Sequence, residues 1–324
     1  MRTEIQVSDW LIVVPEIILL ITAMIILMLN AFAKRAADNS SPWIALGGVV
    51  GSFISLISLW GMRVSGFAGL IVNDQFAVLI DISILIGTAL STLISVNYIR
   101  REELPIGDYY ALMLLSVIGM LLLVASANLI MVFLSLEMLS IALYVITGFA
   151  RSRRKSEEAG MKYFLLGSFS AAILLYGTAL IYGATGTIGL RGIASALTNG
   201  NIASSPVLLA GAGLLLVGLG FKVAVFPFQV WTPDVYEGAP VTVTAFMSVG
   251  SKAAAFAALT RILVVSLAEI RPAWIVVVWV IAVLTMTLGN VVAIAQDNIK
   301  RMLAYSSIAH AGYIMVAIAA SNQL

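Results

Sequence analysis

Long apolar stretches recur along the whole chain, and no other feature constrains its fold as strongly. A helix needs about 20 consecutive apolar residues to cross the hydrocarbon core of a bilayer. Across 324 residues the hydrophobic fraction is 61% and the charged fraction is 10%, whereas a soluble domain has roughly 25% charged residues. The sequence therefore predicts an all-α polytopic membrane protein with about ten transmembrane helices. We expect these helices at residues 10–31, 43–62, 76–98, 109–125, 129–150, 161–183, 207–226, 241–265, 274–295 and 302–320.

Composition also limits the chemistry that this chain can perform. Cysteine is absent and there is one histidine, so a thiolate nucleophile, a cysteine-ligated cluster and an all-protein metal site are not expected. The net charge of +2, without a basic tail, gives no indication of nucleic-acid binding. The expected partners are lipid, other membrane subunits and ions. The first apolar stretch is too long for a signal peptide and lacks a small-residue cleavage pattern, so we interpret it as an anchor.

The basic residues are distributed unequally between the two sets of loops. Loops that follow odd-numbered helices hold ten basic residues: Lys34, Arg35, Arg100, Arg101, Arg151, Arg153, Arg154, Lys155, Lys300 and Arg301. The opposite side, including the N-terminus, holds four: Arg2, Arg63, Arg191 and Arg271. Because basic loops stay in the cytoplasm, the N-terminus is expected outside it.

We single out four ionisable side chains that lie within the expected spans: Glu137, Lys222, Lys252 and His310. An ionisable group at the bilayer centre costs about 2.5–3.5 kcal/mol, so such residues need partners or a purpose. One interpretation is a set of buried ion pairs that fix helix register. The other is a proton relay, because burial lowers the pKa of a lysine and a nearby carboxylate raises it. Two lysines with a single deep glutamate favour the relay.

The run FKVAVFPFQVWTPDVYEGAP places Pro227 five residues after Lys222. Proline removes a backbone hydrogen bond, which is tolerated at membrane depth only where protein or a water-filled cavity satisfies the freed groups. Pro227, Pro233 and Pro240 thus predict a broken seventh helix, and broken helices beside a cation recur at the ion sites of transporters. The alternative is an unbroken helix followed by a loop from Val225 onward.

A weak internal similarity favours a duplicated architecture. Aligning residues 128–144 with residues 298–314 places Ser140 against His310, with polar groups on corresponding faces. Two ordinary membrane helices that begin at polar loops would give the same pattern, so both interpretations stay open.

Three stretches carry a resemblance to a known family. They begin with SLEMLSIALYVITGFARSRRKSEEAG, FKVAVFPFQVWTPDVYEGAP and DNIKRMLAYSSIAHAGYIM. The chain resembles the antiporter-like membrane subunits of proton-translocating NADH-quinone oxidoreductase, respiratory complex I, and among them the subunit N family. This resemblance covers nearly the whole chain. It implies inverted five-helix repeats, a discontinuous seventh helix and a line of ionisable residues at mid-membrane depth.

The same resemblance implies residue roles and a division of the chain. Glu137 corresponds to the fifth-helix glutamate, Lys222 to the seventh-helix lysine, Lys252 to the eighth-helix lysine and His310 to the tenth-helix polar link. The implied segments are three N-terminal helices, the first five-helix repeat and the start of a second, incomplete repeat: residues 1–107, 108–265 and 266–324.

The implied function is proton translocation, coupled to electron transfer from NADH to quinone in partner subunits. The chain would then be a membrane subunit of a translocase, without a redox cofactor or catalytic centre of its own. NADH, FMN, iron–sulfur clusters and quinone would bind to the partners, which are the other membrane and peripheral subunits of the complex. The expected location is the cell inner (plasma) membrane, or alternatively an organellar membrane. A sodium/proton antiporter subunit and a non-conducting membrane scaffold are the other candidate functions.

Two departures from the family pattern affect these expectations. Many relatives have histidine where this chain has Gln229, and an amide cannot titrate, so we expect no proton-carrying role there. The family also continues for about four helices beyond Leu324, including a broken twelfth helix with a lysine. We therefore expect the sequence to be a fragment.

Overall fold

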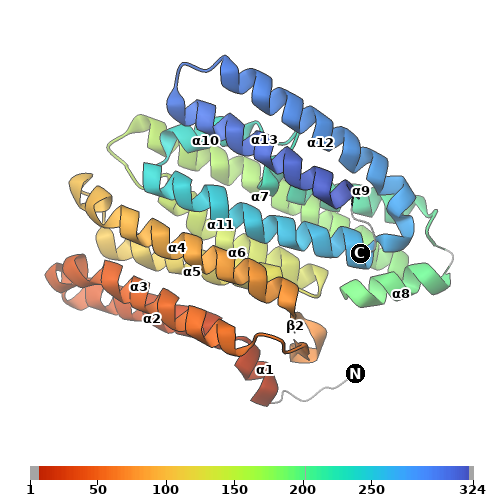
Figure 1. Cartoon of the computed structure of the whole chain (residues 1–324), viewed down its shortest axis with the longest axis horizontal. Coiled ribbons are helices and arrows are strands. Elements are labelled where there is room, and N and C mark those ends of the chain that lie inside the picture. Colours follow the sequence, from red (N-terminus) through yellow and green to blue (C-terminus); the bar gives the residue numbers. More distant parts are fainter. Residues whose placement is uncertain (1–6, 201, 321–324) are drawn as a thin grey trace. The chain divides into compact units, whose positions relative to one another are not determined.

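The computed structural model describes residues 7–200 and 202–320, and the chain there is almost entirely helical (Figure 1). In this part of the chain, ten helical segments are long and apolar enough to cross a membrane, which confirms the predicted fold class. They are α2 (Val14–Phe32), α3 (Lys34–Ser58), α4 (Gln75–Arg101), α5 (Ile106–Ala125), α6 (Leu129–Thr147), α7 (Arg154–Thr185), α9 (Pro206–Val223), α11 (Val241–Thr260) with the π-helical turn η2 (Arg261–Ser266), α12 (Arg271–Ile294) with the preceding 3₁₀ turn η3 (Ala268–Ile270), and α13 (Ile299–Ala320).

The chain divides into two compact units. The first comprises Met1–Gly160 and Ala239–Ala257, and the second comprises Met161–Gly238 and Ala258–Leu324. Contacts define these units, whereas repeat ancestry defines the segments 1–107, 108–265 and 266–324, so that division stays a prediction. Residues 1–6, which include Arg2, and residues 321–324 belong to the first and third of these segments and lie outside the described residues.

In the first unit, α5 forms the centre of the packing. It contacts α2, α3, α4 and α6, and it is the most buried of the ten spans. At Gly119 of α5 an added Cβ would lie 2.5 Å from the backbone nitrogen of Leu139 in α6. The two helices therefore approach to backbone contact, which small residues permit between membrane helices.

The first predicted span is two helices rather than one. A short helix, α1 (Val7–Ile12), precedes α2, and Trp10 belongs to α1. Pro15 occupies the first turn of α2, where its missing N–H costs nothing but cannot continue the preceding turn. The helix that crosses the membrane therefore begins at Val14.

A small hairpin connects α3 to α4. Strand β1 (Val64–Gly66) pairs antiparallel with β2 (Ile71–Asn73) across the 3₁₀ turn η1 (Phe67–Gly69). Asn73 fixes the hairpin to the end of α3, because its amide donates to the carbonyl oxygens of Leu59 and Met62. Strands this short leave little signal in the sequence.

In the second unit, α12 packs along α13, and α8 (Leu190–Gly200) packs against η2. Helices α7 and α9 meet at Gly218, where an added Cβ would lie 2.7 Å from Leu174 Cβ. Ser170 of α7 donates to the Gly218 carbonyl oxygen at 3.0 Å, so a polar bond reinforces this close contact.

The seventh membrane helix is broken, as predicted. Helix α9 ends at Val223, and Ala224 adopts a left-handed conformation with φ of 61°. Helical structure resumes in α10 (Trp231–Gly238). The break thus begins before Pro227, and Pro233 lies in the first turn of α10, where proline is tolerated.

Backbone groups in the break are satisfied by nearby partners. The Phe226 N–H donates to Thr285 Oγ1 of α12 at 2.9 Å, and the Val225 N–H donates to the Gly220 carbonyl oxygen at 3.1 Å. Irregular backbone at membrane depth requires such compensation, because lipid offers no hydrogen-bond partners.

Candidate functional site

Lys222 lies directly before the break in the seventh helix. It is the penultimate residue of α9 and only 2% exposed. The C-terminal end of a helix carries a partial negative charge, which favours a cation at this position. Its Nζ also donates a hydrogen bond to the hydroxyl oxygen of Tyr163, at 3.0 Å. The C-terminal end of α9 and the Tyr163 hydroxyl group thus both stabilise a buried ammonium group.

Tyr163 comes from α7 and is held by the first residue of α10. Its ring stacks on Trp231 with centroids 4.6 Å apart and an interplanar angle of 11°. The Trp231 Nε1–H donates to the carbonyl oxygen of Phe221, the residue before Lys222, at 2.9 Å. Helices α7, α9 and α10 therefore meet around Lys222.

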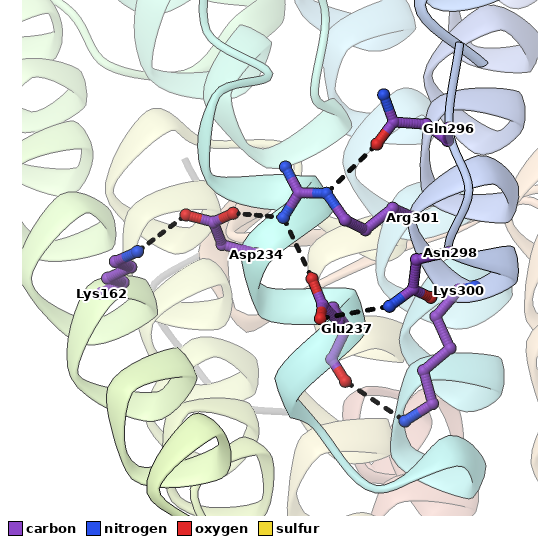
Figure 2. A network of polar contacts seen from close by, with 7 residues as sticks. All are labelled: Lys162, Asp234, Glu237, Gln296, Asn298, Lys300 and Arg301. Carbon is purple, nitrogen blue, oxygen red and sulfur yellow. Dashed lines mark hydrogen bonds and ion pairs between the residues drawn. The ribbon is translucent and has the colours of Figure 1, made fainter. Parts of the chain in front are cut away.

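A cluster of charged and amide side chains holds the acidic face of α10 (Figure 2). Lys162 of α7 lies 2.7 Å from one oxygen of Asp234. Arg301 of α13 lies 2.8 Å from the other oxygen, and 3.1 Å from Glu237. We call this cluster the α10 charge network, which comprises Lys162, Asp234, Glu237, Gln296, Asn298, Lys300 and Arg301.

The remaining members of the α10 charge network come from the start of α13 and the loop before it. Asn298 donates to Glu237 Oε1 at 3.1 Å, and Lys300 Nζ donates to the Glu237 carbonyl oxygen at 3.2 Å. The Arg301 Nε donates to Gln296 Oε1 at 3.2 Å. Figure 2 shows these side chains converging on α10 from one side while Lys162 reaches it from the other.

The ionisation of Asp234 reflects two opposed effects. Partial burial raises the pKa of the carboxyl group, but hydrogen bonds from Lys162 and Arg301 outweigh it and hold the pKa below its ordinary value. Asp234 is therefore a carboxylate at neutral pH and supports both ion pairs.

The structure divides the four predicted relay residues between the two units. Glu137 in α6 is half-buried and Lys252 in α11 is 6% exposed, and both belong to the first unit. Lys222 and His310 belong to the second unit. His310 lies within α13, as expected, but its side chain is exposed, with its ring 5.6 Å from the Tyr313 ring. The relay itself stays a prediction.

Gln229 lies in the break and is 7% exposed. Among the residues that the structure describes, no hydrogen-bond donor reaches its Oε1, and the hydroxyl of Thr232 is likewise buried without a partner. One buried polar atom without a partner in the described part of the chain thus lies in the break, and another lies in the first turn of α10.

Several ionisable residues were not among the predicted site residues. Glu16 and Asp81 are 9% and 5% exposed, within the predicted spans 10–31 and 76–98, and the criterion of membrane depth applies to them equally. The spacing of Asp234 and Glu237, one helical turn apart in WTPDVYEG, was the available signal for the α10 charge network.

Within residues 7–200 and 202–320, no group of three or more histidine, aspartate or glutamate side chains is arranged to hold a metal ion. The expectation that redox cofactors bind to partner subunits stays a prediction.

Comparisons with known proteins place these features in a family. Residues 126–324 match the family model described as NADH:quinone oxidoreductase/Mrp antiporter, TM. A relative from Trichlorobacter lovleyi, NADH-quinone oxidoreductase subunit N, is 49% identical over 96% of this chain and 64% of its own length. The chain thus spans slightly less than two thirds of that relative.

Two solved structures share the fold. One chain in respiratory complex I from Thermus thermophilus with bound aureothin is 34% identical, with a TM-score of 0.78 over 94% of this chain and 64% of that one. A chain of the membrane-bound sulfane sulfur reductase, an archaeal respiratory membrane complex, is 26% identical, with a TM-score of 0.84 over 95% of this chain and 64% of that one.

Proposed function

The chain belongs to the NADH:quinone oxidoreductase/Mrp antiporter family of membrane proteins, and from this premise we propose that it is a proton-translocating membrane subunit of an NADH-quinone oxidoreductase. The 49% identity to a relative named subunit N and the fold shared with a chain of respiratory complex I support this assignment. In this proposal the driving energy comes from electron transfer in partner subunits, which would bind NADH, FMN, iron–sulfur clusters and quinone.

The observation that carries the proposal is the place of Lys222. Lys222 is 2% exposed and lies at the end of a helix that is interrupted within the membrane. Burying a lysine there costs free energy, so its presence indicates a function. A lysine ammonium can release and regain a proton, which an arginine cannot do in practice. The site is therefore suited to carrying protons rather than to fixing helix register alone.

In the proposed relay, protons pass among Glu137, Lys222, Lys252 and His310. Lys252 is a second buried lysine, and Glu137 is a half-buried carboxylate in α6. A carboxylate and amines of this kind can exchange protons when their environments bring their proton affinities close together. Gln229 cannot titrate and would act only as a hydrogen-bonding group.

The chain is a multi-pass membrane protein, and we propose the cell inner membrane as its location. The ten-to-four distribution of basic loop residues supports an N-terminus outside the cytoplasm. Of the four residues on the less basic side, Arg2 lies outside the described residues.

The experiment measures NADH-driven proton uptake in inverted membrane vesicles from the native host. A Lys222→Met variant that assembles into the complex should lose most of its proton uptake. Wild-type uptake in this variant would reject the proposed function. Co-purification of peripheral iron–sulfur subunits with the chain separates this function from that of a sodium/proton antiporter subunit, which shares the family.

A scaffold function gives a different result in the same vesicles. Replacing Glu137 and Lys222 together by apolar residues of similar size, Glu137→Leu and Lys222→Met, would leave coupled pumping intact if the buried charges only guide assembly. Loss of pumping in an assembled double variant excludes the scaffold.

A further inference from the structure

The contact between Lys222 and Tyr163 has a defined direction. An ammonium group has only donors, so the Tyr163 oxygen accepts this 3.0 Å hydrogen bond. The Tyr163 side chain is fully buried. Hydrogen bonds to charged groups are stronger than those between neutral groups. The exclusion of water from a buried site strengthens them more.

The hydroxyl group, rather than the ring face, provides the main interaction with Lys222. The ammonium nitrogen lies 5.1 Å from the centroid of the Tyr163 ring, towards the outer limit of about 6 Å for a cation–π interaction. Its distance to the hydroxyl oxygen is an ordinary hydrogen-bond length. Removing the hydroxyl while keeping the ring therefore removes most of the contact.

The surrounding contacts fix the position of the Tyr163 ring. It stacks on Trp231, whose indole N–H is bonded to the carbonyl oxygen of Phe221. Phe221 directly precedes Lys222, so the contacts form a closed circuit from Lys222 through Tyr163 and Trp231 back to the backbone of α9. Lys162, the neighbour of Tyr163, joins α7 to α10 through Asp234. The hydroxyl group is thereby held at a set point beside the helix break.

From this geometry we propose that Tyr163 is a positioning residue for Lys222. The lysine side chain is long and flexible, and proton transfer requires donor and acceptor within hydrogen-bond distance. The Tyr163 hydroxyl oxygen accepts a hydrogen bond from the ammonium nitrogen and so sets the position of that nitrogen. This role rests on the proposed function, since it has meaning only if Lys222 carries protons.

The test compares Tyr163→Phe with Tyr109→Phe in the assembled complex. Tyr109 is a matched control, because it is equally buried and its hydroxyl bonds to Thr242 rather than to a lysine. Proton uptake should fall roughly tenfold in Tyr163→Phe, the size expected for losing a hydrogen bond to a charged group. Uptake in Tyr109→Phe should stay within about twofold of wild type.

A solvent isotope measurement separates positioning from a structural effect. Uptake rates are measured in H₂O and in D₂O. If Tyr163→Phe misplaces the ammonium group, proton transfer becomes the slow step and the H₂O/D₂O rate ratio rises. If the substitution merely reduces the amount of intact complex, the rate falls and the ratio stays unchanged. A normal rate, or a reduced rate with an unchanged ratio, would overturn the proposal.

A second variant keeps the test decisive if Tyr163→Phe does not assemble. Trp231→Phe keeps an aromatic ring but removes the bond to the Phe221 carbonyl oxygen, so a smaller loss with a raised isotope ratio is expected. An unchanged ratio in Trp231→Phe would then reject the positioning role. Lys222→Met separates a failure of the proposed function from a failure of the positioning role. Normal pumping in Lys222→Met rejects the proposed function itself, whereas impaired Lys222→Met with normal Tyr163→Phe rejects only this inference.

Discussion

Arg301 Nη1 lies 2.8 Å from Asp234 Oδ1, although 67 residues separate the two in sequence. The same nitrogen lies 3.1 Å from Glu237 Oε2. One guanidinium group therefore serves both carboxylates of α10 and ties this short helix to the start of α13. Planar, permanently charged guanidinium groups suit such shared contacts better than a lysine does.

Arg301→Met should destabilise the protein by about 1 kcal/mol, because both ion pairs are lost and two carboxylates one turn apart are left without their shared cation. The side chain is 30% exposed, which limits the effect through solvent screening. Thermal unfolding of the purified protein in detergent measures the change. Lys300→Met is the control, since Lys300 bonds to the Glu237 carbonyl oxygen. Equal losses in the two variants would contradict this account.

Acid should weaken the α10 charge network only at low pH. The pKa of Asp234 in the folded protein lies below its ordinary value of 3.8. Its contribution to stability is therefore complete above pH 3.8 and is lost as the pH falls through the lower folded value. Unfolding temperatures of wild type and Asp234→Asn, recorded from pH 7 to pH 3, should differ by a steady amount at neutral pH and move closer together below pH 3.8. A difference that is constant across this range would exclude Asp234 as its source.

Glu137→Gln should slow proton pumping while the complex still assembles. The substitution keeps the size and hydrogen-bonding capacity of the side chain but removes the charge and the exchangeable acid proton. In inverted vesicles, the quenching of a pH-sensitive dye by NADH addition reports pumping, and native gels report assembly. An assembled Glu137→Gln complex that pumps at the wild-type rate would remove Glu137 from the relay.

The predicted orientation can be tested with single cysteines, because the chain contains none. A cysteine at the exposed position Ser152 should react with a membrane-impermeant maleimide only from the cytoplasmic face. A cysteine at Ser204, an exposed position in the loop after the sixth span, should react only from the opposite face. Reversal of the two labelling patterns would overturn the topology.

Gly289→Ala should destabilise the pairing of α12 with α13. An added Cβ would lie 2.8 Å from the backbone nitrogen of Ala309, and backbone cannot yield as a flexible side chain can. Overpacking of this kind costs about 1–3 kcal/mol. At Gly213 in α9 the same added Cβ meets nothing within 4 Å, so Gly213→Ala should be neutral or slightly stabilising. Denaturant or thermal unfolding distinguishes the two, and equal stability in both variants would refute the packing argument.

The membrane spans were predictable because bilayer thickness fixes the length of an apolar helix, but their ends were not. Helix α3 begins at Lys34 and α7 begins at Arg154, in charged segments that the apolar pattern assigned to loops. Backbone hydrogen bonding continues past the apolar core until a residue interrupts it, so hydropathy alone underestimates helix length. The 3₁₀ and π-helical turns leave no hydropathy signal either.

The site was predictable only in part, for a related reason. The depth of Lys222 and the proline after it pointed to the break, since both are rare and costly within a membrane. Tyr163 carries no such signal, because one aromatic residue in an apolar span resembles any other. The charges around α10 come from three separate parts of the chain, and only the fold brings them together. Depth likewise placed His310 in a span but could not show that its side chain is exposed.

The break before α10 leaves this helix without a continuous hydrogen-bond ladder to α9, because the irregular segment 224–230 separates them. Its attachment within its own unit depends on side chains: the Trp231 ring at its start and the carboxylates of Asp234 and Glu237 on its acidic face. Rotating α10 about its own axis would break these side-chain contacts. It would leave the backbone hydrogen bonds within the membrane spans intact. A displacement of α10 would therefore act first on the irregular segment 224–230, and Lys222 lies directly before that segment.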